Sequence, residues 1–153
     1  MTAATDASAA MRRRVWWSAL VMGAGLAGLA DMVVFHELLH WHHFYDRSTA
    51  GVGLTSDGLL DAVLIAGLVV GVVGLVERAG PAREWGRRVW GGMLAGFGGF
   101  NLFDGLIDHK LLRLHQIRPG AASQLPYDVA WIASSVLILA VGVALLRAGR
   151  GRP

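Results

Sequence analysis

The sequence predicts an all-α integral membrane protein, a four-helix bundle made of two parallel helix-hairpin repeats with both termini in the cytoplasm. Three observations lead to this fold class: long apolar windows, a one-sided distribution of arginine, and a repeat within the chain. The 153 residues are 54% hydrophobic and only 16% charged, with a mean hydropathy of +0.49. This composition is too apolar for an ordinary soluble domain of this length.

Four apolar windows are long enough to cross a bilayer, because a hydrocarbon core of about 30 Å needs about 20 helical residues. The predicted spans are Val15–Phe35, Leu59–Val76, Val89–Leu111 and Val129–Leu146. They form one transmembrane domain, residues 15–147, between a cytoplasmic N-terminal tail (1–14) and a cytoplasmic C-terminal tail (148–153).

Basic residues gather at one set of helix ends, which fixes the predicted orientation. Ten arginines flank that set: Arg12, Arg13, Arg14, Arg78, Arg83, Arg87, Arg88, Arg147, Arg150 and Arg152. The opposite ends carry only Arg47, Lys110, Arg113 and Arg118. By the positive-inside rule both termini are cytoplasmic, in a multi-pass protein of a bacterial inner membrane. The pI of about 10.2 therefore reflects topology and contact with the lipid bilayer, and nucleic-acid binding is not expected.

The opposite, outer ends are rich in titratable side chains. They hold all six histidines, namely His36, His40, His42, His43, His109 and His115. Most of the acids lie there too. The chain contains no cysteine, which excludes disulfides, thiolate metal ligands and thiol nucleophiles.

A shift of 73 positions aligns the two halves of the chain. The pattern D-x4-H-x5-H occurs at residues 31–42 and again at 104–115, each time after a glycine-rich apolar stretch. "LTSD" (54–57) and "LPYD" (125–128) then precede the next span. The predicted repeats are about 15–78 and 88–147, related by an axis along the bilayer normal. The recurrence also argues against reading the first span as a signal peptide cleaved after Ala30.

Aspartate and neutral imidazole together are ligands of zinc, copper, iron and manganese. An acid within a span is usually functional or paired, and facing helices often build metal sites. The predicted metal ligands are Asp31, His36, His40, His42, Asp104, Asp108, His109 and His115. The predicted carboxylates behind them are Glu37, Asp57, Asp61 and Asp128, since ligating histidines commonly donate to a carboxylate. A hydrolase or oxidase would also need a base, for which Glu37, Asp61 and Asp108 are candidates.

Helical spacing leaves the geometry of this site open. In a regular helix an aspartate and the histidine five residues later point about 140° apart. A π-bulge or an unwound turn would bring them together. Alternatively, the aspartate and the histidine belong to different layers of the site, with the aspartate orienting a ligand of another residue. Continued helix would place His36, His40 and His43 on one face of the first span, and Asp104, Asp108 and His115 on one face of the third.

Other interpretations remain at this stage. Asp57 and Asp128 are candidate helix caps, and His43 is a candidate interfacial residue. His36 and His109 could be axial ligands of a haem in a small b-type cytochrome, although the carboxylates make haem the less favoured cofactor. An ion or metal carrier and a purely structural membrane protein are further alternatives. The glycine pairs Gly67-x3-Gly71 and Gly92-x3-Gly96 predict close helix contact, within the chain or in a homo-oligomer.

Two stretches, "FHELLHWHH" and "NLFDGLIDHKLLRLHQIR", resemble the bacterial membrane family called domain of unknown function 2243. The resemblance covers nearly all of residues 15–147. It implies four spans in the inner membrane. It also implies metal handling or redox chemistry linked to respiratory oxidase assembly, with respiratory assembly proteins as partners.

Overall fold

The computed structural model describes residues 2–78 and 82–148. Within this part of the chain all regular structure is helical, which confirms the all-α prediction. The six elements are α1 (Thr2–Asp31), η1 (Met32–Leu38), α2 (Ala50–Val76), α3 (Ala82–Phe103), η2 (Asp104–Leu111) and α4 (Leu125–Ala148), where η marks a π-helix. Most of the predicted C-terminal tail (148–153) lies outside the described residues. Residues 2–14 of the N-terminal tail are helical and continue into the first span.

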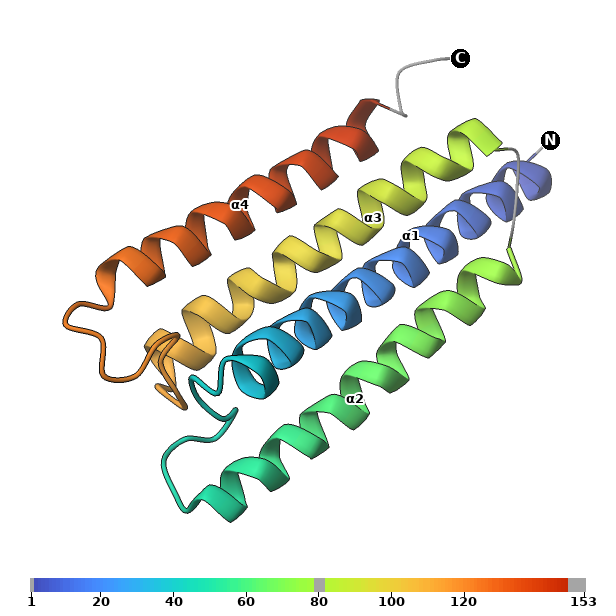
Figure 1. Cartoon of the computed structure of the whole chain (residues 1–153). Coiled ribbons are helices and arrows are strands. Elements are labelled where there is room, and N and C mark those ends of the chain that lie inside the picture. Colours follow the sequence, from blue (N-terminus) through green and yellow to red (C-terminus); the bar gives the residue numbers. More distant parts are fainter. Residues whose placement is uncertain (1, 79–81, 149–153) are drawn as a thin grey trace.

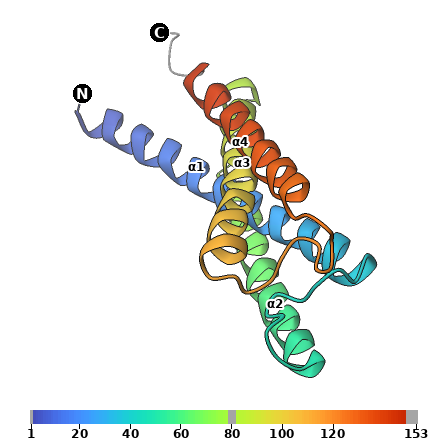
Figure 2. The ribbon, with the colours of Figure 1, turned by 90° about the vertical axis from the view of Figure 1, so that its left-hand side faces the viewer.

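The four long helices lie side by side in the order α2, α1, α3, α4 (Figure 1). The helix backbones approach closely only between neighbours in this row: among the described residues, no Cα atom of α4 lies close to one of α1 or α2. Seen from the side, α1 is inclined to α3 and α4 (Figure 2). The four helices predicted from the sequence are therefore present, and they form an open layer with α1 and α3 at its centre.

Three helical segments are long and apolar enough to cross a membrane: Asp6–Leu38, Ala50–Val76 and Leu125–Ala148. The segment that contains α3 does not meet the same standard. Glycines occupy much of α3, and Arg87 and Arg88 lie near its start. Because α3 packs between α1 and α4, much of its surface contacts protein, so it needs fewer large apolar side chains than a helix surrounded by lipid.

Glycines allow the close contact between the two central helices. A Cβ atom at Gly23 would overlap the carbonyl oxygen of Met93, and one at Gly96 would overlap that of Leu20. These two contacts are related by a shift of 73 residues in both partners. Gly71 and Gly92, which the sequence placed at helix contacts, also pack on helices of this chain. The homo-oligomer stays a prediction of the sequence, and these two glycines already have partners within the chain.

The second helix begins earlier than its apolar window. The first residue of α2 is Ala50, and the Thr49 side chain caps it by accepting a hydrogen bond from the Val52 amide. Asp57 therefore lies inside the helix, and its interpretation as a cap is wrong. Asp128 is likewise not a cap, since α4 begins at Leu125. Both acids are free to serve other partners.

Candidate metal centre

A π-helical segment follows the main helix in both halves of the chain, at the end of the layer opposite the termini (Figure 1). Each segment ends with an amide that bonds five residues back: Leu39 to the Val34 carbonyl at 3.0 Å, and Leu112 to the Ile107 carbonyl at 2.7 Å. Residues five apart consequently become neighbours. Of the alternatives that the sequence left open, the structure has the π-helix.

The wider turn brings each aspartate to the histidine of its own half. His36 Nε2 lies 3.7 Å from Asp31 Oδ2, and His109 Nε2 lies 3.1 Å from Asp104 Oδ2. All four side chains are 10% exposed or less. Each aspartate–histidine pair is thus enclosed at the end of its helix.

The chain then leaves the helix through a left-handed residue, His40 (φ 50°) in the first half and Arg113 (φ 52°) in the second. This turn directs the following loop back over the helix end and brings His42 and His115 into the interior. His40 itself is exposed. Because η1 ends at Leu38, the predicted helical face of His36, His40 and His43 does not form.

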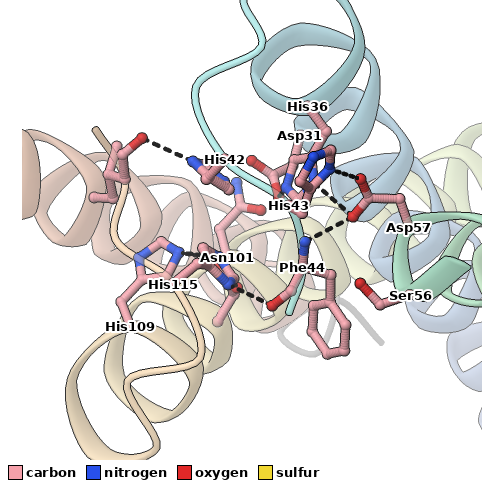
Figure 3. Close-up of polar contacts among 12 residues, drawn as sticks. Asp31, His36, His42, His43, Phe44, Ser56, Asp57, Asn101, His109 and His115 are labelled. Atoms are coloured by element: carbon pink, nitrogen blue, oxygen red, sulfur yellow. Dashed lines mark hydrogen bonds and ion pairs between the residues drawn. The ribbon is translucent and has the colours of Figure 1, made fainter. Parts of the chain in front are cut away.

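Four buried imidazoles meet where the halves join (Figure 3), each from a residue that is at most 5% exposed. The rings of His36 and His42 have centroids 4.4 Å apart at 76°, and those of His109 and His115 are 4.5 Å apart at 79°. Across the junction, His42 and His115 stack at 4.5 Å and 16°. Both halves therefore contribute one histidine from the π-helix and one from the loop, in nearly the same arrangement.

The tautomers of the two loop histidines follow from their backbone partners. His42 Nδ1 lies 2.9 Å from the Ile117 carbonyl oxygen, and His115 Nδ1 lies 2.9 Å from that of Phe44. A carbonyl only accepts, so each ring donates from Nδ1 and carries its lone pair on Nε2. Burial lowers the pKa of His42 to about 2 and also lowers the pKa of His115. Both are thus neutral imidazoles, the form that binds metals.

The first π-helix histidine is held by a carboxylate. His36 Nδ1 donates to Asp57 Oδ1 at 3.1 Å. Asp57 also accepts from His43 Nδ1 and from the Phe44 amide, both at 2.6 Å. The Nε2 atoms of His36 and His42 are buried and have no hydrogen-bond partner within the described chain.

Two groups of donor atoms are close enough together to hold an ion. They are His36, His42 and His115, and Asp104, His109 and His115, with all donors of a group within 4.8 Å of one another. In the second group the Nε2 atoms of His109 and His115 are 2.8 Å apart. Two ligands bound at about 2.1 Å to one ion lie roughly 3.0–3.4 Å apart, so modest movement would admit a metal.

Residues 9–149 match a family described as a predicted membrane protein family, DUF2243. The chain belongs to this family. No curated protein and no solved structure matches it. The membrane character of DUF2243 agrees with the three helices that are apolar enough to cross a bilayer.

In this DUF2243 chain, six of the eight predicted metal ligands lie together: Asp31, His36, His42, Asp104, His109 and His115. His40 is exposed, and Asp108 is half-buried outside the two donor groups. Among the predicted supporting carboxylates, Asp57 holds His36, whereas Glu37 is exposed and Asp61 is half-buried one turn beyond Asp57. Asp128 pairs with Lys110.

Sequence reasoning missed three contributors to this site. The carbonyls of Phe44 and Ile117 orient two rings, and a backbone carbonyl carries no mark in the sequence. The role of His43 on Asp57 was also missed. Its spacing of fourteen residues from Asp57 corresponds to no regular helical contact, because a loop lies between them.

Proposed function

We propose that the chain binds a transition metal through Asp31, His36, His42, Asp104, His109 and His115. One observation carries this proposal: the buried Nε2 atoms of His36 and His42 have no hydrogen-bond partner among the described residues, while their Nδ1 atoms are held by Asp57 and by the Ile117 carbonyl. Buried acceptors without a donor are costly. A cation beside His36, His42 and His115 would satisfy both of these Nε2 atoms.

Zinc, copper, iron and manganese fit a mixed imidazole and carboxylate donor set. The carboxylate behind His36 supports the same assignment, because it fixes the ring and raises its basicity toward a metal. The acids that face both His36 and His109 favour a small cation over a haem, whose porphyrin would need an open apolar plane at these nitrogens.

The proposal includes the arrangement in the membrane. Four spans, with α3 as the fourth, form two parallel hairpin repeats in a bacterial inner membrane, and the metal lies at the periplasmic end. The arginine distribution supports the orientation, and the matched contacts of Gly23 and Gly96 support the repeat. A reporter fused after Pro153, or placed between Arg78 and Arg88, should be active only in the cytoplasm. Periplasmic activity of either fusion would contradict this topology.

Metal content of the detergent-purified chain, normalised to monodisperse protein, tests the function directly. We expect about one or more equivalents of a d-block metal and no Soret band. His36→Ala and His109→Ala should each lower the metal content, whereas His40→Ala should not. A metal-free wild-type protein that also takes up none of the four metals would overturn the proposal, and a Soret band lost in both variants would favour haem.

A further inference from the structure

We infer that the six residues form two metal positions, one in each half, and that the position in the first half binds its ion more tightly. This inference rests on the proposed function and adds to it the number of ions and their order of affinity. The first position consists of Asp31, His36 and His42. The second consists of Asp104, His109 and His115.

The spread of the donor atoms favours two ions over one. Ligands of a single ion, bound at about 2.0–2.2 Å, all lie within about 4.4 Å of one another. Five of the six donors instead fall into two groups that share only His115, and the sixth, Asp31, lies next to His36 of the first group. His115 has one nitrogen to offer, because its Nδ1 donates to the Phe44 carbonyl. His115 can therefore bind an ion of only one group. Its Nε2 atom lies 2.8 Å from the Nε2 atom of His109.

Assigning each loop histidine to its own half gives two positions of the same composition. The ring pairs match, at 4.4 Å and 76° in the first half and 4.5 Å and 79° in the second. In each half the Nε2 of the π-helix histidine faces the aspartate five residues before it. Two imidazoles and one carboxylate leave coordination sites open on both ions for water or for a bridging ligand.

The support behind the two π-helix histidines is different. His36 Nδ1 donates to the buried carboxylate of Asp57. His109 Nδ1 is also buried but has no hydrogen-bond partner in residues 2–78 and 82–148. Asp128 occupies the place in "LPYD" that Asp57 occupies in "LTSD", yet it is bonded to Lys110. A carboxylate behind a ligating histidine is typically worth 10–100-fold in metal affinity, so the first position should be the tighter.

The difference extends to what holds the supporting carboxylate. Asp57 is fixed by His43 and by the Phe44 amide. Gln116 stands at the position that matches His43, and it is exposed. The Lys110 ammonium adds a positive charge next to His109 in the chain, which disfavours a second cation. Both features weaken the second position relative to the first.

Zinc titration of the full-length, metal-stripped chain in detergent, followed by challenge with a chelator, tests the inference. The wild type should take up two equivalents, and one should resist at least about 10-fold more chelator than the other, given the effect of carboxylate support. Asp57→Asn should weaken the tight equivalent by about 10–100-fold. Asp128→Asn is the matched control and should leave the tight equivalent unchanged.

The outcomes separate this inference from the proposed function. Uptake of one equivalent would overturn the two positions but leave metal binding intact, whereas uptake of none would overturn both. Two equivalents of equal affinity, or equal effects of Asp57→Asn and Asp128→Asn, would overturn the difference between the halves. If Asp57→Asn is not monodisperse, single-ligand variants decide instead. His109→Ala should then keep the tight equivalent and His36→Ala the weak one, and the reverse result would contradict the inference.

Discussion

Residues 31–57 and 104–128 form the two hairpin ends. They are alike in the aspartate and histidine side chains that face the other half, and they differ in the groups that hold those side chains from behind. Each supplies an aspartate, a π-helix histidine and a loop histidine with closely similar ring geometry. The loop histidines even exchange partners reciprocally: His42 donates to the Ile117 carbonyl, and His115 donates to that of Phe44, 73 residues before Ile117. Behind these side chains, however, the first half has the buried Asp57, and the second has Asp128 in an ion pair with the half-exposed Lys110.

This comparison indicates which parts of the site are under the tighter geometric constraint. The donors of each half must converge on one point, so their positions leave little freedom. Behind them the halves differ: Asp57 accepts from the Nδ1 atom of His36, whereas the Nδ1 atom of His109 has no hydrogen-bond partner among the described residues. A symmetric arrangement of ligands with asymmetric support can distinguish two otherwise equivalent positions, and substitutions in matched pairs can measure that distinction.

The largest expected difference between the halves concerns the two aspartates of α2 and α4. Asp57→Ala removes the acceptor of His36, His43 and the Phe44 amide, so it should destabilise the metal-free protein by about 3–5 kcal/mol, as expected when one partner of a buried pair is lost. Asp128→Ala breaks only a part-exposed pair with Lys110 and should cost about 0–1 kcal/mol. Thermal unfolding in detergent measures both. Equal losses would mean that the supports are equivalent after all.

A second pair of substitutions should affect the halves equally. Gly23→Ala and Gly96→Ala each place a methyl group against a backbone carbonyl of the facing helix. Since a backbone cannot move aside cheaply, each should destabilise the protein by about 1–3 kcal/mol and lower the monodisperse yield. Gly99→Ala is the control, because no atom lies within 4 Å of its added Cβ. A loss in only one of the two variants would show that α1 and α3 do not contribute alike to their contact.

Much of the fold could be predicted from the sequence because a helix that crosses lipid needs about 20 mostly apolar residues. The apolar windows located all four long helices, but they missed the true start of α2. Residues 50–58 are helical although they include Thr55, Ser56 and Asp57, since polar side chains near a helix end can find partners outside the lipid. The open layer was missed because hydropathy reports what faces lipid and not which helices touch.

The candidate site could be predicted for those residues that recur in both halves of the sequence. Comparison of the halves selected Asp31, His36 and His42 together with their three counterparts, and the structure brings these six side chains together. Helical spacing grouped His40 and Asp108 with the other predicted ligands, but neither belongs to the two donor groups, because the chain there is π-helical or has left the helix and does not turn with 3.6 residues per turn. The reciprocal carbonyls were unpredictable, since their positions depend on how the two loops fold over each other.

The smallest expected effect concerns the left-handed residues that end the two π-helices. His40 and Arg113 have φ near +50° and exposed side chains, so neither belongs to the cluster of buried aspartates and histidines. Left-handed geometry costs a non-glycine residue about 1–2 kcal/mol, while glycine loses about 0.4–1 kcal/mol through the greater freedom of the unfolded chain. His40→Gly and Arg113→Gly should therefore each stabilise the protein by about 0–1.6 kcal/mol, with the metal content unchanged. His40→Val should instead destabilise the protein, because a β-branched side chain tolerates this conformation poorly.

Loss of metal in His40→Gly but not in Arg113→Gly would place His40 among the ligands, as helical spacing had predicted, and would add a further difference between the halves.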